Sequence, residues 1–231
     1  MSTYQEKQFK LFEELEKQFR QKKSNVSTVE PIRNHAKDKR ISLTSVVFLP
    51  RKLQNLLVNK IIKPLKKAGK GVYFYPIESL HATIKNIRII NYPPTFGEND
   101  IRKVKKVFKK VIPKRKSFKF ELKGLFETPN SLSVRAYSSE ALKLLAKELS
   151  KKLIKCDLPD DKKYASNEIF FGNITVCRYY TKPKPEFFKI IKKLKNIYIG
   201  KFSVKKIILI TTDPVCHPSK IKRLGYYNLK N

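Results

Sequence analysis

The sequence predicts an α+β protein made of two similar lobes, with a helical segment in front of them. Two observations lead to this fold class. The order strand, helix, strand, helix, strand occurs twice between residues 41 and 231. The 231 residues are also 41% hydrophobic and include 15 Phe and 11 Tyr, which is enough apolar material for one large core or two small ones. Extended disorder is therefore excluded for most of the chain.

Residues 1–40 form a segment of their own. Within residues 4–23, apolar side chains recur at helical spacing in an otherwise charged stretch, namely Phe9, Phe12, Leu15 and Phe19. This pattern predicts an amphipathic helix that docks on another surface. Residues 24–40 contain Pro31 and show no apolar periodicity, so we expect a linker in which His35 is solvated.

The main body begins at residue 41 and shows the repeated order of elements. The first pass predicts a strand at 42–49, a helix at 51–68, a strand at 72–90, a helix at 100–112 and a strand at 118–126. The second pass predicts a strand at 131–137, a helix at 139–153, a strand at 168–180, a helix at 185–194 and a strand at 201–211. The repeat predicts a duplicated domain over 41–231, with lobes at 41–127 and 128–231 and a binding surface where the lobes face each other.

The chain is strongly basic, with 52 Lys and Arg against 19 Asp and Glu and a net charge of +33. Residues 1–40 carry ten basic and six acidic side chains, so +29 of this charge belongs to residues 41–231. Residues 101–120 alone hold ten basic side chains and no acidic one. Such an excess favours an anionic partner such as RNA, DNA or an acidic membrane. The codon bias of an AT-rich genome, which enriches Lys, Ile and Asn, is the rival cause.

The sequence supports neither a membrane protein nor a metal-binding protein. No run of 18 apolar residues and no secretory signal occurs, so we expect a cytoplasmic protein without a membrane span. An organellar location stays open, although the glutamates of the first helix make a poor transit peptide. Cys156, Cys177 and Cys216 are odd in number and lack ligand spacing, so reduced, buried thiols are expected in place of a metal site or disulfides. No cofactor is implied.

Two tetrapeptides occupy matching places in the two passes. His81-Ala82-Thr83-Ile84 lies in the third element of the first pass, and Asn173-Ile174-Thr175-Val176 lies in the matching element of the second. Side chains alternate along a strand, so the first and third residues of each tetrapeptide share a face. If the lobes are related by a pseudo-two-fold axis, the two polar pairs converge on one cleft.

The sequence segments around these tetrapeptides resemble those of a known family. Residues 75–85 (Tyr-Pro-Ile-Glu-Ser-Leu-His-Ala-Thr-Ile-Lys) and residues 171–178 (Phe-Gly-Asn-Ile-Thr-Val-Cys-Arg) resemble the two signatures of the 2H phosphoesterases. That family includes bacterial and archaeal RNA 2',3'-cyclic phosphodiesterases, also called 2'-5' RNA ligases. The resemblance covers about residues 41–231 and implies a two-lobe fold in which antiparallel sheets face a central cleft and helices lie outside.

The resemblance also implies roles for the matching residues. In the family, one imidazole takes a proton from the attacking oxygen and another gives one to the departing oxygen, hydroxyls hold the phosphoryl oxygens, and no metal is needed. His81, Thr83 and Thr175 match this pattern, whereas Asn173 stands at the place of the second histidine. A carboxamide donates hydrogen bonds but cannot exchange a proton. Losing one positioned acid–base group costs about 10²–10⁴-fold in rate.

Other side chains near the motifs are candidates for binding RNA. Lys85 shares the face of His81 and is expected to meet a phosphate, whereas Arg178 falls on the face opposite Asn173 unless the strand contains a bulge. His217, between two prolines, is expected in a loop, and a catalytic role for it stays open. Several aromatic residues flank the motifs and are either core or base-stacking residues, namely Tyr73, Phe74, Tyr75, Tyr179 and Tyr180.

The preferred hypothesis is a basic RNA-binding protein with a degenerate 2H site, in which Asn173, Lys85 and Arg178 contact phosphates. It extends to a place in a ribonucleoprotein such as a ribosome or mitochondrial ribosome. The alternative is an active, metal-independent RNA 2',3'-cyclic phosphodiesterase or 2'-5' RNA ligase-type enzyme with His81 as acid or base. A module for acidic proteins or membranes leaves the motif pair unexplained. Asn173 and the charge of +33 favour binding, whereas the intact first motif favours retained phosphate chemistry.

Overall fold

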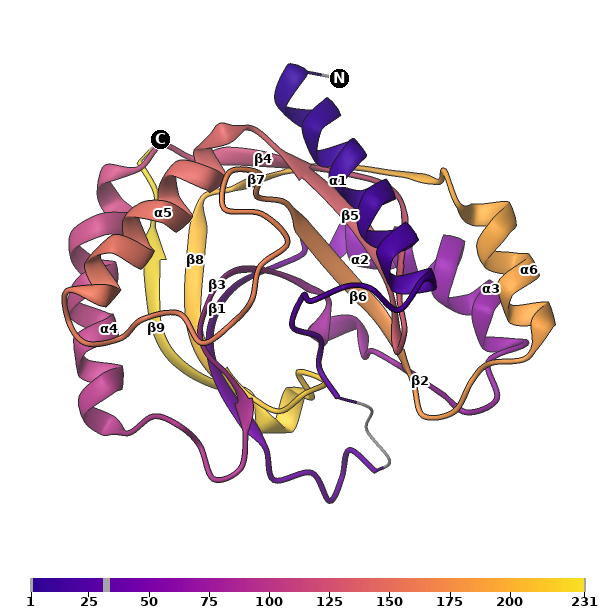
Figure 1. The fold of residues 1–231 in the computed structure, drawn as a ribbon, viewed down its shortest axis with the longest axis horizontal. Helices are drawn as coiled ribbons and strands as arrows, with labels where there is room; N and C mark the ends of the chain where they lie inside the picture. The colour runs from indigo at the N-terminus through magenta and orange to yellow at the C-terminus, as the bar shows by residue number, and fades with distance from the viewer. Residues whose placement is uncertain (1, 31–33, 231) are drawn as a thin grey trace.

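The computed structural model describes residues 2–30 and 34–230. In this part of the chain, nine strands form one curled antiparallel sheet (Figure 1). The strands are β1 (Ile41–Phe48), β2 (Val72–Phe74), β3 (His81–Asn91), β4 (Phe118–Thr128), β5 (Ser131–Ser138), β6 (Gly172–Tyr179), β7 (Tyr198–Val204), β8 (Lys206–Thr212) and β9 (Lys222–Asn228). Their order across the sheet is β7-β4-β5-β6-β3-β1-β8-β9, and β2 pairs with β6.

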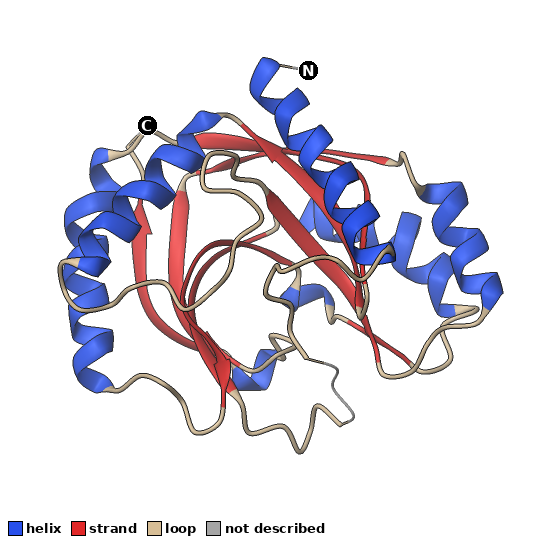
Figure 2. Ribbon diagram, viewed as in Figure 1, coloured by secondary structure: helices blue, strands red, loops and turns tan. Residues whose placement is uncertain are grey.

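The described residues form six α-helices, α1 (Thr3–Arg20), α2 (Arg51–Leu57), α3 (Lys63–Lys66), α4 (Glu98–Val111), α5 (Glu140–Ile154) and α6 (Pro185–Leu194). All but α1 lie outside the curve of the sheet in two groups (Figure 2). Helix α1 crosses the inner face, where its Glu16 meets Arg135, the cross-strand partner of Asn173. A π-helical turn, Val58–Ile62, joins α2 to α3. Helices α4 and α5 lie at one end of the molecule and α3 and α6 at the other (Figure 1). The expected α+β class, with antiparallel strands, external helices and an N-terminal helix, is confirmed.

The two halves of the sheet do not follow the expected lobes 41–127 and 128–231. β4 belongs to the first sequence repeat but pairs with β5 and β7 of the second, and β8 of the second repeat pairs with β1 of the first. The repeat in the sequence therefore describes the order of elements, while the chain exchanges strands between the halves. The halves meet where β3 pairs with β6.

Two expected strands are broken in the structure. The strand expected at 72–90 is interrupted at Pro76 and by a 3₁₀ turn, Ile77–Ser79, because proline cannot donate a ladder hydrogen bond. The strand expected at 201–211 is split at Lys205 into the end of β7 and the start of β8, which lie in different halves of the sheet. The strand expected at 168–180 begins only at Gly172, and β9 had no counterpart among the expected elements.

Helix α1 docks on its own chain. Phe12 is fully buried and contacts the rings of Phe126, Tyr137 and Phe171 at centroid distances of 5.1, 5.6 and 4.2 Å. The buried carboxylate of Glu16 meets the Arg135 guanidinium of β5 at 3.1 Å. These contacts cover one face of β5, which is buried along its whole length.

The linker is packed, which corrects the expectation for His35. Its ring is half-buried and lies 4.6 Å from the ring of Tyr73, and its Nδ1 is 2.8 Å from the hydroxyl of Tyr180. The three cysteines are free thiols, and Cys177 and Cys216 are buried as expected, whereas Cys156 is half-buried.

Candidate functional site

One pair of strands brings the two polar motifs together. β3 starts at the first motif, β6 carries the second, and the strands pair antiparallel at Ala82 and Ile174, whose side chains are buried. The residues one position away on either side have partly exposed side chains and are His81, Thr83, Asn173 and Thr175. Because side chains alternate along a strand, these four share one face.

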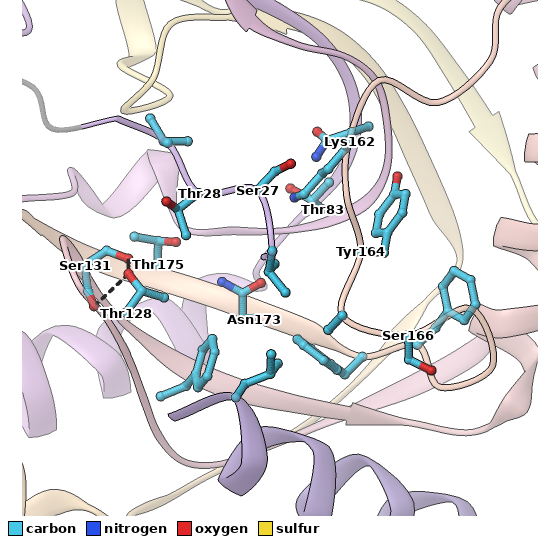
Figure 3. Close-up of a pocket in the computed structure, with 18 of the residues that line it drawn as sticks. Ser27, Thr28, Thr83, Thr128, Ser131, Lys162, Tyr164, Ser166, Asn173 and Thr175 are labelled. Atoms are coloured by element: carbon cyan, nitrogen blue, oxygen red, sulfur yellow. Dashed lines mark hydrogen bonds between the residues drawn. The ribbon is translucent and has the colours of Figure 1, made fainter. Parts of the chain in front are cut away.

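A cavity of about 220 Å³ lies beside the motifs (Figure 3). One buried water needs only about 10–15 Å³ of such volume, so the cavity has room for a larger group. Thr83, Asn173 and Thr175 line it together with Lys162 and Arg178, while His81 stands outside the lining. None of the described residues that line it is acidic. Hydroxyls, an amide and cations form a donor set suited to an anion.

Arg178 reaches this cavity because β6 contains a bulge. Leu132 and Ser133 are neighbours on β5, but their partners on β6 are Cys177 and Thr175, so β6 has one extra residue at this point. The bulge turns Arg178 onto the face of the second motif. The expectation allowed for a bulge in this strand, and the bulge is present, so Arg178 does not lie on the opposite face.

The guanidinium of Arg178 is hydrogen-bonded to the described protein only through its Nε. Its Nε donates to the hydroxyl of Tyr75 at 3.0 Å and to the carbonyl oxygen of Pro214 at 3.2 Å. Among the residues that the structure describes, no partner engages its two terminal amino groups. A guanidinium fixed in this way can present both amino groups to two oxygens of one phosphate.

Lys85 lines the cavity, but its ammonium group is already paired with a carboxylate. Its Nζ forms an ion pair with Asp160 and donates to the hydroxyl of Tyr164 at 3.3 Å, and the side chain is 3% exposed. Burial lowers the pKa of Lys85, and Asp160 opposes this effect. A phosphate at Lys85 would therefore compete with Asp160.

Lys162, which the sequence analysis missed, is the second available cation. Its side chain lies in the cavity lining (Figure 3), and no carboxylate of the described chain pairs with it within 4.0 Å. Burial, followed by the nearby charges of Arg178 and Lys85, lowers the pKa of Lys162 to about 8, against a smaller opposing effect of Asp161. The surroundings thus disfavour its positive charge, which an anionic ligand would relieve.

The imidazole of His81 is fixed in one tautomer. Its Nδ1–H donates to the carbonyl oxygen of Ser79 at 2.7 Å, since a carbonyl oxygen only accepts. Nε2 therefore carries the lone pair. Burial lowers the pKa of His81, but Cys216 and the Ser79 carbonyl raise it, and the net pKa lies above its usual value. The ring packs edge-on against Phe48 at 6.0 Å.

Asn173 belongs to a short hydrogen-bond chain. Its amide Nδ2 donates to the hydroxyl of Ser133 at 3.1 Å, and that hydroxyl donates to Oγ1 of Thr175 at 3.2 Å. Ser133 comes from β5 and was absent from the expected site. The chain orients an amide and a hydroxyl toward the cavity without supplying a group that titrates near neutral pH.

The linker forms part of the wall of the cavity. Residues 26–29 are part of the lining, and Figure 3 shows Ser27 and Thr28 at the cavity. The backbone N–H of Ser27 donates to the Lys163 carbonyl at 3.1 Å, and the backbone N–H of Lys163 donates to Oγ of Ser27 at 2.9 Å. This double tie joins the linker to the loop that carries Lys162.

His217 follows Cys216, a neighbour of His81, but its own ring contacts the linker. Its ring stacks on that of His35 at 5.9 Å, and its Nδ1 is 2.8 Å from the hydroxyl of Ser219. Its backbone N–H donates to the buried carboxylate of Asp213 at 2.8 Å. These contacts place His217 in a turn at the edge of the cleft, packed with the linker.

Residues 2–30 and 34–230 show neither a cluster of metal ligands nor a membrane-spanning helix. No group of three or more His, Cys, Asp or Glu side chains is placed to hold a metal ion. No described helix is long and apolar enough to cross a membrane.

Comparison with solved structures identifies the fold. The protein TT0787 of Thermus thermophilus superposes with a TM-score of 0.59 at 16% identity, over 83% of this chain and 98% of that chain. The fold is that of the LigT-like 2H phosphoesterases. Apo LigT of E. coli gives a TM-score of 0.56 at 14% identity, over 83% of this chain and 99% of its own, and another phosphoesterase gives 0.58 at 13%, over 84% of this chain and 100% of its own. No family model and no curated protein sequence matches the chain.

Within this 2H phosphoesterase-like fold, the structure adds groups that sequence reasoning did not supply. Lys162, Ser133 and the linker residues at 26–29 all line or support the cavity. No periodicity marks them, because they lie in a loop, a buried strand and an irregular segment. No signal in the sequence points to Lys162, which directly follows Asp160 and Asp161.

Proposed function

We propose that the cleft binds RNA through its phosphates and that catalysis is reduced or lost. The observation that carries the proposal is the cavity beside the motifs, where Arg178 and Lys162 stand with the hydroxyls of Thr83 and Thr175 and no acidic lining residue. Crystal structures of E. coli LigT contain 3'-AMP, ATP or phosphate, so proteins of this fold accept such ligands. The net charge of +33 supports a polyanionic ligand over a small one.

Reduced catalysis follows from the chemistry of Asn173. Its amide can hold a phosphoryl oxygen, but it cannot deliver a proton to a leaving group or take one from an attacking oxygen. One positioned acid–base group is worth about 10²–10⁴ in rate. The hydrogen bond from Asn173 to Ser133 fits a binding role.

The second candidate function is a slow, metal-independent RNA 2',3'-cyclic phosphodiesterase or 2'-5' RNA ligase-type enzyme. The ordered imidazole of His81 favours it, because its Nδ1–H is fixed by the Ser79 carbonyl and its Nε2 carries the lone pair that an acid–base group requires. The pKa above the usual value enlarges the share of His81 in its protonated, proton-donating form. The partner group would then be a bound water or the RNA hydroxyl itself.

A lasting place in a ribonucleoprotein is the cellular role we propose for the binding function. An enzyme acting on an RNA end needs positive charge only near that end. Here the excess extends over the main body, far beyond the cleft. A protein held permanently against RNA phosphates would have its self-repulsion offset by the ligand.

The test is a salt titration of RNA affinity with cleft variants. Arg178→Gln and Lys162→Gln are compared with Lys163→Gln, an exposed neighbour outside the cavity lining. Hydrogen bonds to charged groups contribute about 1.5–3 kcal/mol, so each cleft variant should bind roughly 10–100-fold more weakly. Each should also lower the slope of log K against log salt by about 0.7, as expected for one lost phosphate contact on a single strand. Cleft variants that bind like Lys163→Gln would refute phosphate binding in the cleft.

A further inference from the structure

Helix α4 presents a row of basic side chains that the cleft does not use. Its apolar side is buried in the core, through Val104, Val107, Phe108 and Val111. Its outer side carries exposed basic residues, namely Arg102, Lys105, Lys106, Lys109 and Lys110. No acidic side chain of the described residues lies within 4.0 Å of these five. At 1.5 Å per residue, the row extends over about 12 Å.

A second basic surface lies on α3 and α6, which contact each other. Lys63 and Lys67, at the ends of α3, are exposed, as are Lys189, Lys192 and Lys193 of α6. As on α4, none of these five is paired with an acidic side chain in the part of the chain that the structure describes. Neighbouring Lys66 differs, because its Nζ lies over the ring of Phe74 at 5.9 Å.

The two surfaces lie at opposite ends of the longest axis of the molecule (Figure 1). They are therefore separated by the whole sheet and cannot share one short anionic site. The exposed side of α4 offers no apolar residue to enter a lipid layer, which argues against a membrane as its partner. Phosphate backbones that approach from two sides complement both.

We propose that these two surfaces, the α4 face (102, 105, 106, 109 and 110) and the α3–α6 face (63, 67, 189, 192 and 193), bind the backbones of two separate RNA segments. The protein then bridges RNA. The inference rests on RNA as the proposed ligand, but it does not depend on the cleft. Contacts of this kind position the protein and carry no base specificity, since lysines meet phosphates as point charges.

A bridging assay tests the inference. One RNA hairpin is immobilised on beads and a second, fluorescent hairpin is free, and the retained fluorescence is measured with the protein kept below the RNA concentration. Each face is neutralised by five substitutions to Gln. The matched control removes the same charge from exposed basic residues of the N-terminal segment, where glutamates are interspersed, through Lys7→Gln, Lys10→Gln, Lys17→Gln, Arg20→Gln and Lys23→Gln.

The natural protein and the control should both retain the second hairpin, whereas each face variant should still bind one hairpin and retain at least about tenfold less of the other. A mixture of the two face variants should not restore bridging, because restoration would mean that dimers join the hairpins. Face variants that bridge like the control would overturn the inference. Failure to bind any RNA would remove the proposed function as well, whereas RNA binding without bridging would remove this inference alone.

Discussion

Replacing Lys162 by glutamine is expected to stabilise the protein in the absence of RNA. Burial and the charges of Arg178 and Lys85 hold the pKa of Lys162 at about 8, against a usual value of 10.5. At 1.36 kcal/mol per pKa unit, this difference corresponds to about 3 kcal/mol. Because the side chain is partly exposed, solvent screening lowers the expectation to about 1–2 kcal/mol.

The stabilisation should depend on pH in a defined direction. Below about pH 8, both the folded and the unfolded chain carry the ammonium charge, so its full cost weighs on the fold. Between about 8 and 10.5 the folded chain releases the proton first, and stability rises with pH. The advantage of Lys162→Gln should thus be largest at pH 7 and shrink toward pH 10.

Urea denaturation at pH 7 and at pH 9.5 measures this difference between natural protein and variant. The exposed Lys163→Gln serves as the control and should shift the midpoint little at either pH. The same Lys162→Gln protein should bind RNA more weakly, so stability and binding change in opposite directions. A variant that is less stable than the natural protein at pH 7, or whose advantage grows with pH, would refute the view that the cavity is built to meet an anion.

Three further changes test how the site is supported. Phe12→Ala should lower the free energy of unfolding by about 3–5 kcal/mol, because it leaves a cavity where a buried ring was packed. Phe9→Ala, at an exposed position, should lower it by less than about 1 kcal/mol. Urea denaturation measures both, and equal losses would contradict the docking of α1. Gly172→Ala should cost about 1–3 kcal/mol, because a Cβ there would lie 2.8 Å from a buried ring of β4, and a neutral result by thermal melting would contradict this packing. Ser27→Ala removes one tie of the linker to Lys163, so limited proteolysis should cut the linker faster than in the natural protein; unchanged cleavage would show that the tie does not hold the linker.

The repeated order of elements and the stripe on the first helix could be predicted because both are periodic. The apolar residues of α4 and of α1 recur at helical spacing, and the polar motifs occupy equivalent strands. The helices at 100–112 and 185–194 therefore lie close to their expected bounds. Similar periodicity cannot show which half of the sheet a strand joins, so the exchange of β4 and β8 between the repeats was not visible.

The candidate site was less predictable than the fold. A bulge adds one residue without changing the composition of β6, so the face of Arg178 could not be fixed from alternation alone. The ion pair of Lys85 with Asp160 joins residues far apart in the chain, and nothing in the sequence marks their contact. The linker is also irregular, so its course over the cavity and the packing of His35 depend on tertiary contacts.

Our central proposal is that Asn173 removes acid–base catalysis from a cleft that still binds RNA phosphates. The direct measurement is hydrolysis of an RNA that ends in a 2',3'-cyclic phosphate, by the natural protein and by the Asn173→His and His81→Ala variants, with binding of the same RNA measured for all three. We expect similar RNA binding by all three proteins, turnover by Asn173→His about 10²–10⁴-fold faster than by the natural protein, and no turnover by His81→Ala. Turnover by the natural protein as fast as by Asn173→His, and lost in His81→Ala, would contradict the claim and establish an active enzyme.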